Sequence, residues 1–361
     1  MVRLLISGYY GCGNAGDEAV LAGLVAGLRA RLGPGLGLTV LSGDPPDTAT
    51  RYRVEAVPRA SFGAVCRALG RADALISGGG GLFQDASGPA SPLYYGGLIV
   101  LARLRRRPVV AVGQGIGPLR RRLSRAACRL ALRACAYVAV RDPESQALLA
   151  AMGVDSALGA DLAYLLPAPS PEAVKAAWEK AGGRPEGPVV GVSLRPLPGA
   201  GESENLLAAC AQALNGLSGV TALLLPFQPG LDTLPLAHLA GRLAIPHRLV
   251  ETPLEPEALL ALAADLQAMV AMRLHALILA ARAGTVPVGI SYDPKVDAFL
   301  ARLGLAAATR ADQPEPAPLA DAVEHALRSG VPPGLASANA ALVAAAGRML
   351  DDACSRLTCP H

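Results

Sequence analysis

The chain has 361 residues, of which 52% are hydrophobic but only 4% aromatic, and it contains 40 glycines and 30 prolines. This length favours two domains over a single hydrophobic core, and many tight turns between short Ala-, Leu- and Val-rich segments suit an α/β protein. The net charge of +4 is mild, and charged residues interrupt the most apolar stretch, residues 258–283, so we expect no membrane-spanning helix.

The seven cysteines are scattered and odd in number, and no C-x-x-C motif occurs. Their spacing lacks the pattern of a metal site and favours a reducing compartment. The apolar run behind the first methionine is too short for the hydrophobic region of a signal peptide. We therefore expect a cytoplasmic protein that uses no metal or other cofactor.

Short apolar runs recur along the chain, each ending in a polar or glycine-rich turn and followed by a segment of helical character. In the first half they cover residues 3–11, 38–44, 74–85, 109–118, 137–145 and 156–166. In the second half they cover residues 189–199, 222–230, 247–250, 268–275 and 286–295, with a weaker run at 305–313. Continuous apolar runs are typical of parallel strands buried on both faces. We therefore predict an α/β fold of two doubly wound, Rossmann-like domains facing a cleft, which is a GT-B-like architecture.

A proline-rich segment, residues 167–188, predicts the division between the domains. We expect an N-terminal Rossmann-like domain at 1–166, a C-terminal one at 184–330, and a C-terminal helix and tail at 331–361. Residues 335–352 of that last part have the composition of a helix that could pack on either domain.

The first polar turn, "GYYGCGNAGD" at residues 8–17, contains the pattern G-x-G-x-x-G at Gly11, Gly13 and Gly16. In a dinucleotide-binding protein these glycines bring the backbone close to a pyrophosphate at a helix N-terminus. The apolar run before the turn and the helical segment after it fit that interpretation.

Two acidic residues argue against a dinucleotide. Asp17 and Glu18 fall in the first turn of the helix, where their charges would oppose a bound pyrophosphate. A dinucleotide site also needs an acidic residue about 20 residues further on to bind the ribose, and only Ser42 or Asp44 lies near that position. We therefore interpret Asn14, Asp17 and Glu18 as a loop that binds hydroxyl groups and could supply a base.

Two later turns are also rich in glycine. "SGGGGLFQDASG" at residues 77–88 exposes backbone N–H groups that a ligand could approach closely, although a flexible turn that avoids the neighbouring domain is an alternative. "GQGIGP" at residues 113–118 is a second glycine-rich turn, one predicted strand later. The candidate binding residues of these turns are Gly79, Gly80, Asp85 and Gln114.

Cations follow several of the apolar runs. Arg141, Arg195, Arg273 and Lys295 each stand near the end of a predicted strand. His275 follows Arg273 at a junction of strand and helix, and it is either a structural histidine or a functional one; we favour the functional interpretation. Four cations at strand ends predict a small ligand with several negative charges, such as phosphate and carboxylate groups.

Arginines are also spaced four apart at Arg121, Arg125, Arg129 and Arg133, with further arginines in 103–107. This spacing places them on one stripe of a helix, which is either a solvated face or a surface that contacts anionic lipid. No nucleic-acid-binding motif accompanies the stripe, so we expect no nucleic-acid partner.

From about residue 3 to residue 325 the chain resembles the polysaccharide pyruvyl transferase family, specifically its cell-surface-anchoring (CsaB) group. The resemblance rests on the order and spacing of "GYYGCGNAGDEAVL", "SGGGGLFQD", "GQGIGP", "RD" with Ser145, "MRLHALILA" and "SYDPKV". It implies a GT-B-like fold and transfer of pyruvate from phosphoenolpyruvate to a sugar with release of phosphate. The acceptor in this group is usually β-ManNAc of a lipid-linked cell-wall polysaccharide precursor, and the product is a 4,6-ketal that S-layer homology domains recognise.

The resemblance implies that Arg141, Arg273, His275 and Lys295 form the cationic pocket for phosphoenolpyruvate. It also implies that the second domain is the phosphoenolpyruvate side and that the first domain is the acceptor side, with Asn14 to Glu18. Since phosphoenolpyruvate carries a phosphate and a carboxylate, it accounts for several cations. Its chemistry needs one acid and one base, for which we assign His275 and Asp17, with Asp85 in reserve.

Two alternatives stay open. A nucleotide-sugar glycosyltransferase would share the architecture and would use Asp293 or Asp297 on the ribose. A non-catalytic module that binds sugar phosphates is the other. We expect the protein in the cytoplasm, with peripheral contact at the inner face of the plasma membrane.

Overall fold

The computed structural model describes residues 2–33, 35–86 and 88–358. The chain divides into two compact units. Unit 1 contains the chain up to Cys12, Asp17–Pro167 and the chain from Leu342 onward; unit 2 contains Gly13–Gly16 and Ala168–Ala341. Four residues of the first glycine-rich turn thus belong to unit 2.

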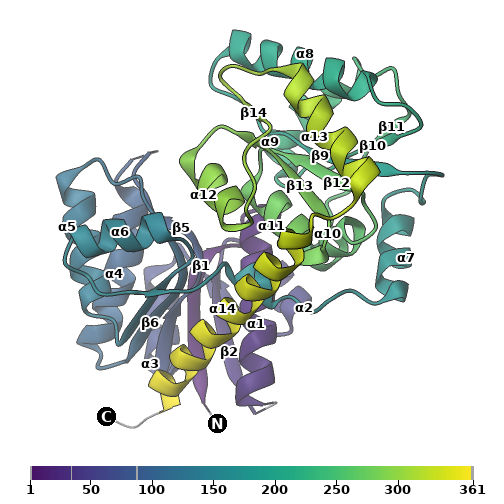
Figure 1. Ribbon diagram of the computed structural model, residues 1–361. Helices are drawn as coiled ribbons and strands as arrows, with labels where there is room; N and C mark the ends of the chain where they lie inside the picture. The colour runs from purple at the N-terminus through teal and green to yellow at the C-terminus, as the bar shows by residue number, and fades with distance from the viewer. Residues whose placement is uncertain (1, 34, 87, 359–361) are drawn as a thin grey trace. The chain divides into compact units, whose positions relative to one another are not determined.

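Unit 1 is built on a parallel sheet, which has eight strands within the described residues. The strand order is β3-β2-β1-β4-β6-β7-β8, and β5 pairs with β6 (Figure 1). The central strands are buried almost throughout, which is why their sequences are continuous apolar runs. The strands are β1 (Arg3–Tyr10), β2 (Gly37–Ser42), β3 (Glu55–Pro58), β4 (Ala74–Ser77), β5 (Gly80–Phe83), β6 (Val109–Ile116), β7 (Tyr137–Val140) and β8 (Ala157–Leu158).

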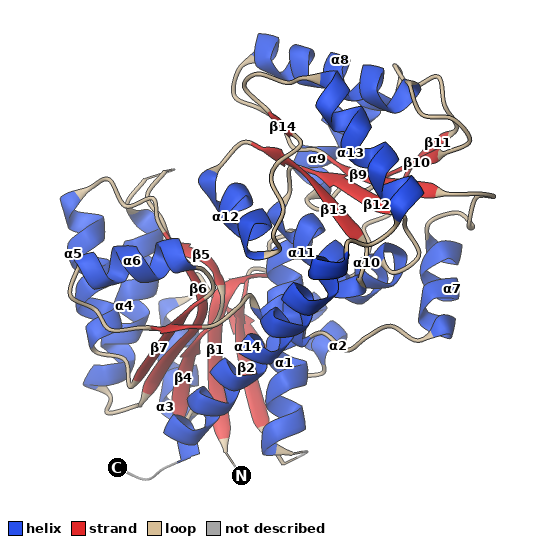
Figure 2. Cartoon of the chain, viewed as in Figure 1, coloured by secondary structure: helices blue, strands red, loops and turns tan. Residues whose placement is uncertain are grey.

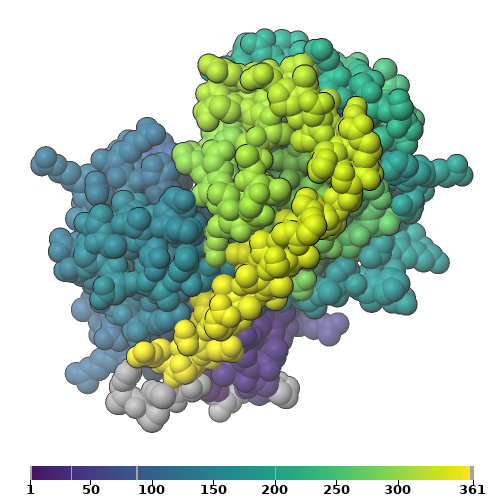
Figure 3. All heavy atoms as spheres, viewed as in Figure 1, coloured from purple at the N-terminus to yellow at the C-terminus, as the bar shows by residue number. Residues whose placement is uncertain are grey.

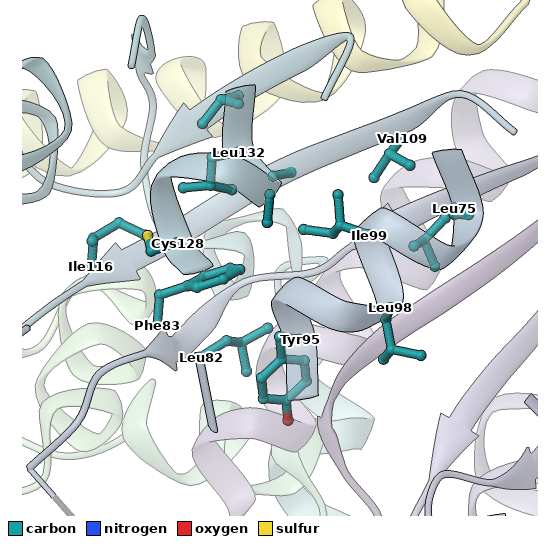
Figure 4. Close-up of a cluster of buried hydrophobic side chains, with 14 of the residues drawn as sticks. Leu75, Leu82, Phe83, Tyr95, Leu98, Ile99, Val109, Ile116, Cys128 and Leu132 are labelled. Atoms are coloured by element: carbon teal, nitrogen blue, oxygen red, sulfur yellow. The ribbon is translucent and has the colours of Figure 1, made fainter. Parts of the chain in front are cut away.

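Helices cover this sheet. They are α1 (Ala15–Leu32), α2 (Pro45–Tyr52), α3 (Phe62–Arg71), α4 (Ala90–Leu104), α5 (Arg122–Arg133), α6 (Pro143–Ala151) and the 3₁₀ helix η1 (Leu162–Leu165). Side chains of α3, α4, α5 and α6 share one buried cluster with the strands, so these helices cover the same face. Figure 4 shows part of that cluster, with Leu98 and Ile99 from α4, Leu132 from α5, and Leu75 and Val109 from the strands.

The C-terminal helix α14 (Pro333–Thr358) contributes its second half to unit 1. Gly27 of α1 faces the side chain of Leu350, which is fully buried. Arg31 of α1 donates from Nε to Asp351 at 2.6 Å. In Figure 3 the yellow atoms of this part of α14 lie against the purple atoms of the N-terminal elements.

Unit 2 has a second parallel sheet, of order β11-β10-β9-β12-β13-β14 (Figure 2). Its strands are β9 (Val189–Ser193), β10 (Thr221–Leu224), β11 (His247–Leu249), β12 (Ala268–Ala271), β13 (Val286–Ser291) and β14 (Thr309–Arg310). Its helices are α7 (Pro171–Lys180), α8 (Ala200–Asn215), α9 (Pro229–Ala240), α10 (Pro256–Ala263), α11 (Leu274–Ala283), α12 (Pro294–Arg302) and α13 (Pro316–Ser329). Buried side chains of α8, α9 and α13 pack with this sheet into a core separate from that of unit 1.

The same N-terminal cap, an aspartate followed by proline, begins helices in both units, among them α6 and α12. Asp142 accepts a hydrogen bond from the backbone N–H of Ser145 at 2.7 Å, and Pro143 opens α6. Asp293 accepts from the N–H of Lys295 at 3.1 Å, and α12 opens with proline as well. An aspartate N-cap followed by proline satisfies free N–H groups and fixes the backbone for the first turn.

The predicted α/β class with two parallel sheets is confirmed, and each predicted apolar run contains a strand. The short strand β3 was not predicted. The run at 156–166 yields only β8 and then η1, and the expected terminal helix extends over Pro333–Thr358. Among the described residues, no helix is long and apolar enough to cross a membrane.

Candidate functional site

In each unit the polar turns predicted from sequence lie at the carboxyl edge of its parallel sheet. In unit 1 these turns follow β1, β4, β6 and β7, and in unit 2 they follow β9, β10, β12 and β13. The carboxyl edge is where open α/β sheets bind ligands. The two edges are described in turn.

The turn after β1 is fixed by a glutamate. Gly11 has φ +67°, and an added Cβ would come within 2.0 Å of the Ser42 hydroxyl, so only glycine fits. Glu18 is 6% exposed and accepts hydrogen bonds from the N–H of Gly11 and the hydroxyl of Tyr52, each at 2.7 Å. Burial raises the pKa of Glu18, and these two hydrogen bonds lower it by less, so its pKa lies above the usual range. Glu18 therefore anchors the turn.

The third glycine of the fingerprint makes room for a side chain of the protein itself. A Cβ on Gly16 would lie 2.2 Å from Nδ1 of His275, so the imidazole packs directly on the glycine backbone. Asn14 accepts from the N–H of Gly16 at 2.9 Å, and the N–H of Ala15 donates to the carbonyl of Phe227 at 2.8 Å. Gly13–Gly16 thus form part of the surroundings of His275 within unit 2.

The four-glycine turn after β4 packs around two other elements of unit 1. A Cβ on Gly79 would meet the carbonyl oxygen of Gly113 at 2.8 Å. Gly80 has φ +102°, and its Cβ position lies 3.0 Å from Oδ1 of Asp17, so this glycine brings the backbone against that carboxylate. Gln114 is fully buried and donates from Nε2 to the carbonyl of Ser77 at 3.0 Å. The structure therefore brings Asp17 to the glycine turn and uses Gln114 to hold it.

Arg141, 8% exposed, is paired with acids of its own unit. Its Nη1 donates to Asp161 at 2.9 Å, and its Nε lies 3.6 Å from Asp142. The guanidinium lies over Gly115, where a Cβ would come within 2.7 Å of it. Burial lowers the pKa of Arg141, and the charges of Asp161, Asp142 and Asp17 raise it by more. Asp161 thus supplies an anion that the sequence analysis had assigned to a ligand.

Asp85, the reserve base, holds the loop that leads into α5. Its two carboxylate oxygens accept from the backbone N–H groups of Arg120 and Arg121, at 2.9 and 2.7 Å. Burial raises the pKa of Asp85, and these hydrogen bonds lower it by more, so its pKa lies below the usual range of an aspartate.

Arg273, the N-cap residue of α11, is also paired with a buried acid. Its Nε donates to both oxygens of Asp232, at 3.2 and 3.0 Å, and its Nη2 donates to Asp232 and to Gln228. Asp232 is fully buried and also accepts from the N–H groups of Phe227 and Gln228. The guanidinium is therefore held at the start of α11, next in sequence to Leu274 and His275.

Arg195, just beyond β9, differs from these two arginines. Its guanidinium lies over the ring of Tyr292, 4.7 Å from the centroid, and its buried Nε makes no hydrogen bond. Among the described residues no carboxylate forms an ion pair with it. The Nζ of Lys295 lies 5.3 Å from the centroid of the same ring and 3.3 Å from Asp293.

Arg195 lines a cavity of about 320 Å³. The other polar residues of the lining are Glu202, Tyr292, Arg310 and Asp312. Arg310 donates to Asp312 at 3.0 Å, and the second acid of the lining, Glu202, forms no ion pair with Arg195. The guanidinium of Arg195 can therefore accept an anionic group.

The sequence analysis missed the acids that balance two of its cations. Asp161 and Asp232 stand in the apolar runs "GADLAYLL" and "PFQPGLD", and only the fold shows that they face Arg141 and Arg273. The signal that could have found them is an acid in an otherwise apolar context, which is rarely buried unless paired. Within the described residues, no group of three or more His, Cys, Asp and Glu side chains could hold a metal ion.

Comparison with known proteins gives a family. The sequence model of the family described as "Polysaccharide pyruvyl transferase" matches residues 14–294. No curated protein sequence matches the chain.

Solved structures give the fold. The chain is similar to UDP-GlcNAc 2-epimerase from Methanocaldococcus jannaschii, with 12% identity, a TM-score of 0.66, and 98% of this chain and 100% of that chain covered. It is similar to UDP-GlcNAc 2-epimerase from Neisseria meningitidis, with 10% identity, a TM-score of 0.62 and 99% of each chain covered. The glycotransferase of kitacinnamycin matches with 16% identity and a TM-score of 0.60, covering 99% of this chain and 98% of that chain. These likenesses confirm the GT-B type of fold.

Proposed function

Because the chain belongs to the polysaccharide pyruvyl transferase family, we propose that it transfers the pyruvyl group of phosphoenolpyruvate to a sugar, with release of phosphate. The proposed acceptor is β-ManNAc of a lipid-linked cell-wall polysaccharide precursor, and the product is a 4,6-ketal. The ketal carries a carboxylate, and we propose that S-layer homology domains recognise it.

The observation that carries the proposal is the anion-accepting edge of unit 2. Arg195 has no acidic partner among the described residues, and Lys295 also lies over the ring of Tyr292. The N-termini of α11 and α12 add positive potential at the same edge. A phosphate and a carboxylate on one small molecule match this arrangement.

We propose a different role for the two arginines that are paired with aspartates. Arg141 and Arg273 contribute oriented N–H groups rather than net charge, because buried aspartates balance both. In this proposal Arg195 and Lys295 supply the charge that binds the donor, and Asp232 holds the guanidinium of Arg273 at the start of α11. Asn14, Glu18 and the glycine turns shape the backbone around His275 and Asp17.

The proposed chemistry uses one acid and one base. His275 donates a proton to the methylene carbon of phosphoenolpyruvate, and the carbon that bears the phosphate becomes electrophilic. The first sugar hydroxyl attacks this carbon and gives its proton to Asp17. The C–O bond to phosphate then breaks, phosphate leaves with the bonding electron pair and the proton from Asp17, and the second hydroxyl closes the ketal and returns a proton to His275.

Phosphate release tests the proposal directly. The purified protein is incubated with phosphoenolpyruvate and a soluble β-ManNAc glycoside, and phosphate and the acidic ketal are measured. Both products should require donor and acceptor together. Sugar transfer from UDP-GlcNAc in place of pyruvyl transfer would contradict the proposal and favour a nucleotide-sugar enzyme.

An arginine pair tests the donor site. Arg195→Gln should raise the KM for phosphoenolpyruvate about 10- to 100-fold, since hydrogen bonds between charged groups contribute about 1.5–3 kcal/mol. Arg242→Gln is the control, because Arg242 is paired with Glu204 at 2.7 Å on the surface of the same unit. Equal KM values for the two variants would remove Arg195 from the site.

A further inference from the structure

Unit 1 has an apolar groove that begins at Arg59, just beyond β3, where Arg59 donates to Sγ of Cys12 at 3.5 Å. The groove has a volume of about 490 Å³ and lies between α3 and α4. Its floor includes Val65 and Leu98, and Leu98 belongs to the cluster in Figure 4. At its rim lie Phe62 and Leu104, which are 74% and 77% exposed. Large apolar side chains exposed to this degree beside an apolar groove indicate a contact surface.

Arginines lie at both ends of the groove. At the end near β3, the guanidinium of Arg59 lies over aromatic rings, 5.0 Å from the centroid of Tyr9 and 5.2 Å from that of Tyr94. Beyond Leu104, Arg105 donates to the carbonyl of Cys66, and Arg107 donates to that of Gly70. These two hydrogen bonds join the segment at the end of α4 to α3.

The charge around the groove has one sign. Between residues 59 and 141 every charged side chain is an arginine except Asp73 and Asp85. Asp73 accepts from the backbone N–H of Arg3, and Asp85 accepts from two backbone N–H groups. Neither carboxylate forms an ion pair with an arginine side chain of the described residues. The exposed arginines of α3 and of the end of α4 are Arg67, Arg71, Arg103, Arg105 and Arg106, and of these Arg71 lies 3.9 Å from Glu55.

We propose that this groove and its arginines dock unit 1 on an anionic membrane surface. Phe62 and Leu104 enter the boundary between headgroups and acyl chains, and the arginines bind lipid phosphates. A second copy of the chain fits less well, because a symmetric contact through this face would place arginine against arginine. The proposal does not depend on the donor chemistry of unit 2.

Sedimentation with vesicles tests the docking. The intact protein is mixed with vesicles of phosphatidylcholine containing phosphatidylglycerol, and with vesicles of phosphatidylcholine alone, at increasing salt. Binding should occur on the anionic vesicles and weaken with salt. Phe62→Ser/Leu104→Ser should lower the partition coefficient at least tenfold, and Arg103→Ser/Arg106→Ser about thirtyfold, at about 1 kcal/mol per arginine.

The matched control is Leu231→Ser/Leu234→Ser on α9, where both leucines are exposed at 48% and 65%. It should bind vesicles like the unaltered protein. Phosphate release with a soluble acceptor should be the same in all these proteins, which separates this test from that of the proposed function.

Several results would overturn the proposal. One is equal vesicle binding by Phe62→Ser/Leu104→Ser and the control. Another is a loss confined to Arg125→Ser/Arg129→Ser, which would place the contact on α5 instead. Binding of polyglutamate without binding of vesicles would show an acidic protein partner, and a dimer that Leu104→Ser dissociates would show a second copy.

Discussion

At Gly16 the sequence motif suggested one neighbour for the glycine backbone and the structure shows another. The pattern suggested a glycine that admits a ligand, and the structure has the imidazole of His275 at that position. Gly16→Ala should displace the imidazole and lower pyruvyl transfer about a hundredfold, as a misplacement of about 1 Å can. Gly81→Ala is the control, since a Cβ there meets nothing within 4 Å. Phosphate release that is equal in the two variants would show that the position of His275 is irrelevant.

Asp17 and Asp85 are the two candidates for the base. Asp17→Asn should lower kcat by about 10²- to 10⁴-fold, because a general base contributes a factor of that size. Asp85→Asn should lower the melting temperature and affect kcat less, because its oxygens accept backbone hydrogen bonds. Kinetics and thermal melts of both variants check this. The opposite pattern would move the base to Asp85.

Glu18 gives a prediction for pH. Its pKa is raised in the folded state, so the folded protein binds this proton more tightly than the unfolded chain. The resulting stabilisation is present below the unfolded pKa of about 4.3 and is lost as the pH rises through the folded pKa. The melting temperature of Glu18→Gln relative to the unaltered protein should therefore rise between pH 4 and pH 7. A difference that is constant or falls would contradict the assigned shift.

The sequence predicted which residues would gather at strand ends, because parallel strands present their carboxyl ends on one edge. It did not predict which charges would already be balanced. Asp161 and Asp232 lie 20 and 41 residues from the arginines that they pair with, Asp161 just before η1 and Asp232 in the first turn of α9. Pairing at that separation depends on tertiary packing, and the sequence alone therefore overestimated the charge offered to a ligand.

At the scale of elements, the pair of Arg141 and Asp161 ties the end of β7 to the segment before η1. Asp161→Asn should destabilise the protein by about 3–5 kcal/mol, because it leaves a buried guanidinium without a full countercharge. Arg141→Met/Asp161→Leu should recover most of that loss, since it removes both charges. Urea unfolding of the three proteins measures the effect. A double variant as unstable as Asp161→Asn would show that shape, rather than charge, is at fault.

The elements themselves were largely predictable. Long apolar runs gave the buried central strands, and the segments of helical character after them gave most of the helices. The missed strand β3 is an edge strand of Glu55–Pro58 with no fully buried residue, so it lacks the continuous apolar signal of its neighbours. Edge strands are half solvated and short, and their pairing is decided by the sheet that they join.

At the scale of the molecule, two cores predict two unfolding units. Leu350→Ala on α14 and Leu214→Ala on α8 each remove a buried side chain, from unit 1 and unit 2, and should cost about 2–5 kcal/mol. In calorimetry each should shift a different transition. If both shift one common transition by similar amounts, the units unfold together as one cooperative body.

The division of the chain has a consequence for its gene. The chain passes from one unit to the other after Cys12, Gly16, Pro167 and Ala341, so the codons of unit 1 are interrupted twice. A gene segment for residues 1–167 would encode a unit 1 without Leu350, and one for 168–341 a unit 2 without Gly16 beside His275. Recombination that exchanges a single block of coding sequence would therefore separate parts that fold together. Chimeras of this protein with a relative should work only when the three segments of unit 1, or the two segments of unit 2, are exchanged together.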